Sequence, residues 1–242
     1  MPRQSSNPFN SFTARIAAAI LALLTMCTVP MAFSADAASA SGSGKSLVVI
    51  GASYAQGWGQ PALEGYRVVN KGVGGEESSQ VRARFERDAV ALRPDTVLIW
   101  GHINDIFRSP RDQLQQAKQR ARDNYKAMHA QAQAAGIDVV LATEVTMPVG
   151  DTWKDRIMAL IGKIRGRENY RVMINGHVKE INQWLRTYAA EHDLKLLDFE
   201  RVVDSGNGSR RMEFSQPDGS HISVAGYEAL TKYTRAELQA AR

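Results

Sequence analysis

Short apolar runs alternate with longer amphipathic stretches along most of this chain. Branched and apolar residues gather in five short runs, a pattern typical of β-strands. These runs are Leu47 to Ile50, Arg67 to Asn70, Thr96 to Trp100, Val139 to Thr143 and Leu194 to Leu197. Because the stretches between them repeat apolar residues at helical spacing, the pattern predicts βαβ units around a central, mostly parallel five-stranded sheet.

Four of the longer stretches predict helices, because their apolar residues recur every three or four positions. They run from Ser78 to Leu92, from Arg111 to Ala135, around Val178 to Tyr188, and from about Val224 to Ala241. The residues expected on the inward faces include Val81, Phe85, Ala89 and Leu92, then Leu114, Ala117, Ala121, Tyr125, Met128, Ala132 and Ala135, and finally Ile181, Leu185, Tyr227, Leu230 and Leu238. Arg93-Pro94-Asp95 and Gly136 are the expected ends of the first two helices. Between Val145 and Asn175 the pattern is less regular and predicts a helix plus a surface excursion.

The first 37 residues resemble a secretory signal peptide. Arg3 and Arg15 precede an apolar run from Ile16 to Val29, and small residues follow it, which predicts cleavage between about Ser34 and Ala40. An uncleaved membrane anchor is the alternative, but the run is shorter than the roughly 20 apolar residues that a membrane span needs. We therefore expect a periplasmic or secreted protein without a stable membrane span, a flexible lead-in at 38–45, and one domain at 46–242.

Composition adds little that is specific to the expected domain. The chain has 242 residues, of which 44% are hydrophobic and 23% charged, which is ordinary for a globular protein. Its only cysteine, Cys27, lies in the predicted signal peptide, and a lipid attached there is a weaker alternative because Met26 stands where a small residue is expected. Basic residues such as Arg82, Arg84 and Arg87, or Lys118, Arg120 and Arg122, are interspersed with acids and predict solvated helix faces, so no nucleic-acid partner is expected.

Residues that suit nucleophilic catalysis follow the predicted strands. Ser53 comes just after the first strand, the sequence Asn70-Lys71-Gly72-Val73-Gly74-Gly75 ends the second, and Asn104 follows the third. Asp218 and His221 lie three residues apart near the end of the chain. Since the carboxyl ends of parallel strands meet at one edge of a sheet, these residues are expected to share one site.

Each of these residue types has a chemical reason to be there. A serine hydroxyl needs a base to take its proton, which His221 can do, and Asp218 can hold the imidazole in the required tautomer. The backbone N–H groups of Ser53 and Gly75 and the side-chain amide of Asn104 can stabilise an oxyanion, at about 3 kcal/mol for each donor.

These motifs resemble the four sequence blocks of the SGNH hydrolases, also called GDSL esterases and lipases. Gly51-Ala52-Ser53-Tyr54 stands in place of Gly-Asp-Ser-Leu, Gly75 is the counterpart of the family glycine, Asn104-Asp105 resembles the third block, and Asp218-Gly219-Ser220-His221 resembles Asp-x-x-His. The resemblance implies a three-layer α/β/α sandwich, flavodoxin-like in its sheet, and a hydrolase that forms an acyl-serine intermediate without metal or cofactor.

Three departures from the family pattern are visible. Ala52 and Tyr54 replace the usual Asp and Leu, and Ile222 follows His221 where many members have proline. In the third block, one additional residue stands between Gly101 and Asn104.

Several structural alternatives stay open for the same residues. Ser53 could cap a helix starting at Tyr54, Asp218-Gly219 could be only a turn, and the glycines after the second strand could form a tight turn or cradle a phosphate. Neither a phosphate-loop lysine nor a Gly-x-Gly-x-x-Gly motif follows the first strand, which argues against nucleotide binding. The five histidines show no metal-ligand spacing, so no metal site is predicted.

The expected function is therefore an exported serine esterase acting on a small-molecule or glycan ester. Tyr54, Trp58 and His102 lie near the predicted nucleophile or Asn104 and are candidates for a substrate pocket, although a structural role is favoured for His102. Two alternatives are an O-acyltransferase that passes the acyl group to a glycan and a binding protein of the same fold without activity.

Overall fold

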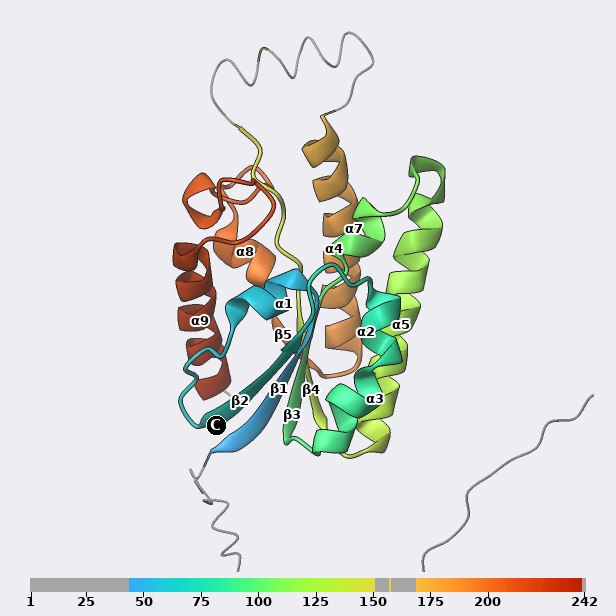
Figure 1. Cartoon of the computed structure of the whole chain (residues 1–242), viewed down its shortest axis with the longest axis vertical. Coiled ribbons are helices and arrows are strands. Elements are labelled where there is room, and N and C mark those ends of the chain that lie inside the picture. Colours follow the sequence, from blue (N-terminus) through green and yellow to red (C-terminus); the bar gives the residue numbers. More distant parts are fainter. Residues whose placement is uncertain (1–43, 151–156, 158–168, 241–242) are drawn as a thin grey trace, which may run out of the picture. The chain divides into compact units, whose positions relative to one another are not determined.

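Five parallel strands form the sheet at the centre of the fold (Figure 1). The computed structural model describes residues 44–150, 157 and 169–240. The strands are β1 (Lys45–Gly51), β2 (Tyr66–Gly72), β3 (Thr96–Trp100), β4 (Asp138–Ala142) and β5 (Lys195–Leu197). All five predicted strands are confirmed, and β1 begins at the last residue of the expected lead-in. The predicted signal peptide and much of the expected surface excursion lie outside the described residues.

The strand order β2-β1-β3-β4-β5 decides where a site can form. Every neighbouring pair is parallel, with Val49 of β1 aligned with Asn70 of β2 and with Leu98 of β3. The chain moves outward from β1 to β2 and then back to the other side of β1 to form β3. Ligand sites of open α/β sheets lie beyond the carboxyl ends of the strands where the order reverses in this way.

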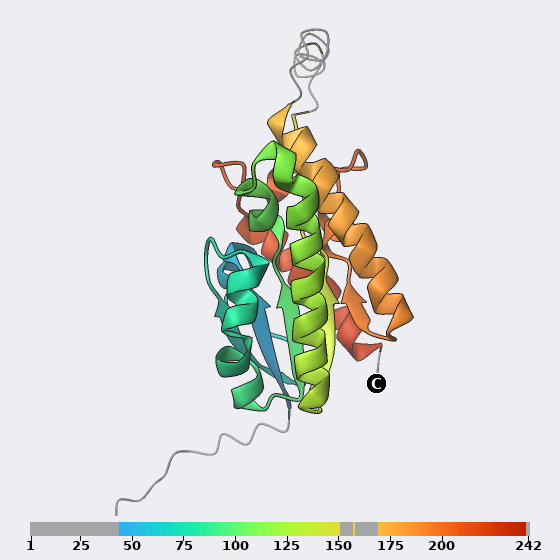
Figure 2. The same cartoon turned by 90° about the vertical axis from the view of Figure 1, so that its right-hand side faces the viewer.

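Helices cover both faces of the sheet, which gives the predicted three-layer α/β/α sandwich (Figures 1 and 2). One layer contains α1 (Ser53–Trp58), α8 (Phe199–Val203) and α9 (Val224–Gln239). The opposite layer contains α2 (Ser78–Ala83), α3 (Phe85–Asp88), α5 (Leu114–Ala134) and α7 (Tyr170–Glu191). The described residues also form the short helices α4 (Ile103–Phe107), η1 (Val90–Leu92), η2 (Arg111–Gln113) and η3 (Met212–Phe214). No helix within these described segments is long and apolar enough to span a bilayer.

The single helix predicted from Ser78 to Leu92 is wrong in detail. The chain forms α2, α3 and η1 instead, with breaks at Arg84 and Ala89. Val81, Phe85 and Ala89 are buried as predicted, but Leu92 is 47% exposed. The break at Arg84 accompanies burial of its guanidinium against backbone carbonyls of the sheet, so tertiary contacts override the helical periodicity.

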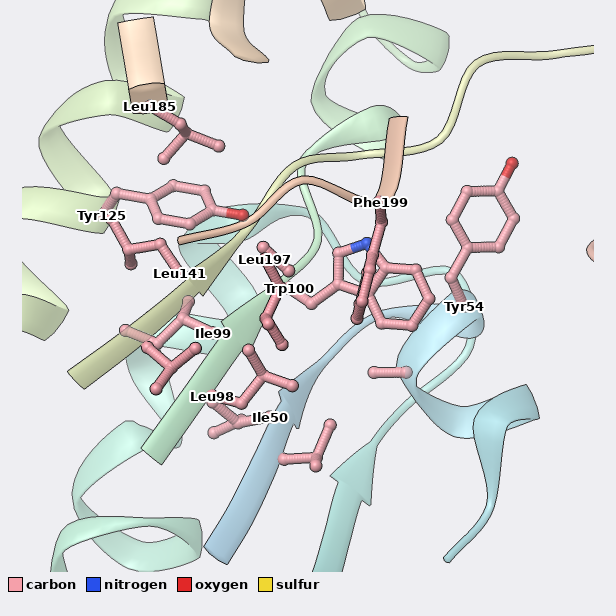
Figure 3. Close-up of a cluster of buried hydrophobic side chains, with 14 of the residues drawn as sticks. Ile50, Tyr54, Leu98, Ile99, Trp100, Tyr125, Leu141, Leu185, Leu197 and Phe199 are labelled. Carbon is pink, nitrogen blue, oxygen red and sulfur yellow. The ribbon is translucent and has the colours of Figure 1, made fainter. Parts of the chain in front are cut away.

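An aromatic cluster fills the space between the sheet and the layer of α1, α8 and α9 (Figure 3). Trp100, the last residue of β3, is fully buried, and its ring centroid lies 4.8 Å from that of Phe199 and 5.8 Å from that of Trp58. Edge-to-face contacts of this kind add to the hydrophobic gain of burying large rings. This cluster supports α1, the helix that begins with Ser53.

Two basic residues that the sequence assigned to solvated helix faces are buried. Arg84 is 8% exposed and Lys118 is 1% exposed. Lys118 is paired with Glu180 and lies 3.3 Å from Nδ1 of His177, while Arg84 pairs with Glu76 and Asp88. The prediction of fully solvated faces is therefore wrong at both positions. Glu180 of the distant helix α7 compensates the charge of Lys118, whereas nearby carboxylates and carbonyl oxygens of the sheet compensate that of Arg84.

Candidate active site

Ser53 is the first residue of α1 and follows β1 after one intervening residue. Ala52, not Ser53, occupies the N-cap position, so the alternative in which Ser53 caps a helix starting at Tyr54 is wrong. The turn depends on Gly51, because a Cβ there would lie 1.7 Å from the carbonyl oxygen of Trp100. Ser53 is partly exposed at the carboxyl edge of the sheet.

Asp218 and His221 form a hydrogen-bonded pair in the loop before α9. Oδ2 of Asp218 lies 2.5 Å from Nδ1 of His221, and its Oδ1 accepts hydrogen bonds from the backbone N–H groups of Ser220 and His221. These bonds, above all the one from the imidazole, hold the pKa of Asp218 well below its usual range. The carboxylate is thus ionised and fixed against one ring nitrogen, and Nε2 remains for another partner.

The loop after β2 brings Gly75 close to Asn104. Gly75 has a φ of +79°, a left-handed conformation that suits glycine, and its N–H makes no hydrogen bond to any described residue. Nδ2 of Asn104 donates to the carbonyl oxygen of Glu76 at 2.8 Å. This bond uses one of the two amide hydrogens and leaves the other available.

Contacts of neighbouring residues show how these parts approach one another. A Cβ at Gly74 would lie 4.0 Å from Cβ of Ser53, so the loop after β2 passes next to the serine. The ring of Tyr54 lies edge-on to that of His221, with centroids 6.5 Å apart. No hydrogen bond joins Ser53 to His221 in this structure.

The three residues suggested for a substrate pocket are all interior. Trp58 is 6% exposed, Tyr54 4% and His102 is fully buried. Trp58 donates from its indole nitrogen to Thr231, and burial lowers the pKa of His102 to about 3, which keeps its imidazole neutral. Their role toward a substrate stays a prediction, while the structural role favoured for His102 fits its burial.

The family assignment rests on the greater part of the chain. The model of the GDSL-like lipase/acylhydrolase family matches residues 42–229, a range that includes every block described above. The chain belongs to this family. The predicted SGNH membership and the class of carboxylic ester hydrolase are therefore confirmed.

Several characterised or solved proteins are similar to this chain in sequence or in fold. An acetylxylan esterase of Geobacillus stearothermophilus is 40% identical over 63 residues, which is 26% of this chain and only 29% of that enzyme. A solved catalytic mutant of an acetylxylan esterase from the same organism is 20% identical, with a TM-score of 0.56 and coverage of 81% of this chain and 95% of that chain. A lipase/acylhydrolase from Enterococcus faecalis is also 20% identical, with a TM-score of 0.57 and coverage of 81% and 96%. These structures agree with the predicted fold.

The additional residue in the third GDSL block does not move Asn104 away from the loop after β2. His102 takes the N-cap position of α4, so that Asn104 lies in the first turn of that helix. From there its amide reaches Glu76, the residue after Gly75. The departure is thus accommodated before α4 begins.

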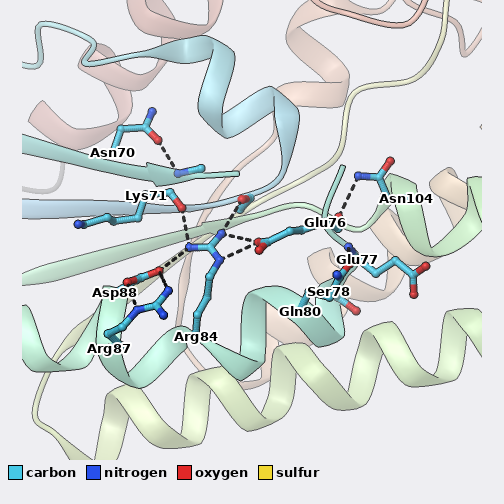
Figure 4. Close-up of polar contacts among 12 residues, drawn as sticks. Asn70, Lys71, Glu76, Glu77, Ser78, Gln80, Arg84, Arg87, Asp88 and Asn104 are labelled. Carbon is cyan, nitrogen blue, oxygen red and sulfur yellow. Dashed lines mark hydrogen bonds and ion pairs between the residues drawn. The ribbon is translucent and has the colours of Figure 1, made fainter. Parts of the chain in front are cut away.

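Arg84 is a buried residue of the site region that sequence reasoning missed (Figure 4). Its guanidinium donates to the carbonyl oxygens of Gly51 and Lys71, at the ends of β1 and β2, at 3.0 and 2.7 Å. It also donates to the carboxylate of Glu76 at 2.7 Å. The side chain of Arg84 therefore links the strand before Ser53 to the loop that contains Gly75. Its position in a predicted amphipathic helix gave no indication of these contacts.

Two further buried charges, Glu144 and Arg210, were also missed. Glu144 is fully buried just after β4, where its Oε2 accepts hydrogen bonds from the backbone N–H groups of His102 and Ile103. Burial raises its pKa to about 7. Arg210 is 1% exposed and donates to the carbonyl oxygen of Ser220. A carboxylate directly after an apolar strand was a usable signal for Glu144, whereas the sequence around Arg210 is unremarkable.

Among residues 44–150, 157 and 169–240, no group of three or more histidine, cysteine, aspartate or glutamate side chains is arranged to hold a metal ion.

Proposed function

We propose that this protein is an exported serine esterase that hydrolyses carboxylic esters through an acyl intermediate on Ser53. The observation that carries the proposal is the 2.5 Å contact between Oδ2 of Asp218 and Nδ1 of His221. In the same loop, the carbonyl oxygen of Ser220 accepts a hydrogen bond from the hydroxyl of Tyr54, the residue after Ser53. Family membership supports ester hydrolysis, and the residues supply one group for each step.

In the first step, Nε2 of His221 takes the proton of the Ser53 hydroxyl as Oγ attacks the carbonyl carbon of the ester. Asp218 keeps the proton of the imidazole on Nδ1 and stabilises the imidazolium that forms. The negative charge that develops on the substrate oxygen is stabilised by the N–H groups of Ser53 and Gly75 and by the amide of Asn104. His221 then gives its proton to the departing alcohol.

In the second step, water replaces the alcohol. His221 takes a proton from the water molecule, whose oxygen attacks the acyl carbon, and the same oxyanion donors act again. Collapse of the intermediate returns the proton to Ser53 and releases the carboxylic acid. Neither a metal nor a cofactor is required by this sequence of steps.

Short acyl esters of carbohydrates are the substrates that we propose. The support comes from the acetylxylan esterase of Geobacillus stearothermophilus, which resembles this chain in sequence over 63 residues. Export is supported by the sequence pattern of residues 1–37, and a carbohydrate polymer outside the cytoplasm suits an exported enzyme.

The test uses the purified protein with a fluorophosphonate probe, p-nitrophenyl acetate and acetylated xylan. We expect covalent labelling of Ser53, release of acetate from both substrates, and loss of labelling and turnover in Ser53→Ala. Folded wild-type protein that neither reacts with the probe nor releases acetate would overturn the proposal. Acetate that appears on an added acceptor glycan rather than in solution would assign the acyltransferase alternative instead.

A further inference from the structure

We propose that Tyr54 and Arg210 are positioning residues that hold the loop of His221 in register with Ser53, an inference that rests on the esterase function proposed above. Both side chains donate a hydrogen bond to the same acceptor, the carbonyl oxygen of Ser220, at 2.7 Å from Tyr54 and 2.8 Å from Arg210. This carbonyl belongs to the peptide bond that leads into His221. We refer to Tyr54, Arg210 and the Ser220 carbonyl as the clamp.

Tyr54 is well placed to transmit the position of the nucleophile, because it is the next residue after Ser53 in α1. Its side chain is buried, and its ring centroid lies 6.0 Å from that of Trp100. The hydroxyl of Tyr227 donates to the Tyr54 carbonyl oxygen at 3.1 Å. The phenol therefore has little freedom, and its hydroxyl reaches the histidine loop from a fixed point.

Arg210 holds the same loop at a second point. Its Nε donates to the hydroxyl of Ser215 at 3.0 Å, and Ser215 forms an antiparallel bridge with Ile222, directly after His221. The guanidinium carbon lies 5.7 Å from the ring centroid of Tyr54, so the cation also contacts the phenol. One arginine thus contacts both arms of the loop and the residue beside the nucleophile.

The clamp completes the restraint of the histidine backbone. The His221 N–H donates to Asp218, and its carbonyl oxygen accepts from the N–H of Gln216 at 2.9 Å. The Ser220 carbonyl, which belongs to the same peptide bond as this N–H, is the group that the clamp holds. Proton transfer from Ser53 depends on the distance between its Oγ and the imidazole, and a displacement of about 1 Å can cost on the order of 100-fold in rate.

The clamp depends on a residue that departs from the family motif. Leucine, which the motif has after the serine, carries no hydrogen-bond donor, whereas tyrosine has a hydroxyl. The replacement at position 54 therefore adds a connection between the nucleophile and the base that the motif residue cannot make.

Tyr54→Phe is the direct test, because it removes one hydroxyl and keeps the ring. Arg210 still satisfies the Ser220 carbonyl, so the fold should persist, which circular dichroism and the melting midpoint verify. We expect kcat for p-nitrophenyl acetate and the rate of fluorophosphonate labelling to fall about 10-fold each, with KM changed less than about twofold. Tyr233→Phe, which removes a phenol that accepts from the N–H of Asp198 at 3.3 Å, is the matched control and should keep wild-type rates.

Arg210→Lys keeps the positive charge but loses the planar guanidinium that donates to both Ser215 and Ser220. It should lower kcat and the rate of fluorophosphonate labelling as well. Because both residues act on one carbonyl, the rate loss of the double variant should be smaller than the product of the two single rate losses.

Wild-type kcat and labelling rate in Tyr54→Phe would overturn the clamp while leaving the esterase function intact. A rate loss in Tyr54→Phe that disappears well below its melting midpoint would also overturn it, because it would reflect stability alone. Wild-type protein without labelling or turnover would instead overturn the function itself.

Discussion

The guanidinium of Arg84 donates a hydrogen bond of 3.0 Å to the carbonyl oxygen of Gly51, two residues before Ser53. The same side chain binds the carboxylates of Glu76 and Asp88, each of which is at most 16% exposed. Burying charged groups costs desolvation free energy, which the attraction between the partners offsets. Removing the arginine alone would leave buried carboxylates with this cost uncompensated. Arg84 therefore supports both the strand before the proposed nucleophile and the loop of Gly75.

Replacing Arg84 by methionine should lower both stability and activity. The change leaves the carboxylate of Glu76 without its donor, leaves Asp88 paired with Arg87 alone, and removes one donor from each of two carbonyl oxygens. We expect the free energy of unfolding to fall by about 3 kcal/mol. Denaturant unfolding measures this loss, and the rate with p-nitrophenyl acetate should fall as the oxyanion donors lose their support. Arg87→Met is the matched control, because Arg87 is 76% exposed in its pair with Asp88, and it should show no measurable change in either quantity. Equal stability of the two variants would contradict the role of Arg84.

Replacing Asp218 by asparagine should reduce kcat by about 10³-fold to 10⁴-fold with little change in KM, because the amide cannot stabilise the imidazolium or fix its tautomer. The pH dependence offers a second measurement. Hydrogen bonds from His221 keep the pKa of Asp218 well below its usual range, so this carboxylate stays ionised through the mildly acidic range. We therefore expect no step in the wild-type pH–rate profile near the ordinary pKa of an aspartate, about 3.9. A step there that is absent from the profile of Asp218→Asn would contradict this assignment.

Glu144 should make the stability of the protein depend on pH in a direction opposite to that of an ordinary carboxylate. Burial raises its pKa from 4.5 to about 7. Between these values the folded protein holds a proton that the unfolded chain has released, so the free energy of unfolding falls as the pH rises, by up to about 1.4 kcal/mol per pH unit.

Glu144→Gln removes this titration, and its amide oxygen can still accept from the N–H groups of His102 and Ile103. We expect the stability of the variant relative to wild type to increase between about pH 4.5 and pH 7 and then to level off, as measured by urea unfolding at each pH. Glu228→Gln on the exposed side of α9 serves as the control and should show a constant difference. A constant difference for Glu144→Gln as well would show that this carboxylate is not buried in its neutral form.

The sequence alone predicted the five strands, because alternating apolar and amphipathic segments allow few other arrangements. It also predicted the Asp218 and His221 pair, since a spacing of three residues in a turn is a local property, and the structure joins these two side chains. The order of the family blocks placed Ser53, Gly75 and Asn104 at one edge of the sheet, and their contacts agree with that placement. Their catalytic roles stay predictions.

Only the tertiary structure decided the environment of the buried polar residues. Arg84 and Lys118 occupy positions that resemble solvated helix faces but are buried, and the buried hydroxyl of Tyr54 donates to the carbonyl oxygen of Ser220. The physical reason is that a buried charge or hydroxyl is tolerated only where partners arrive from distant segments. Residue type and periodicity describe a segment by itself, whereas these partners become neighbours only when the whole chain has folded.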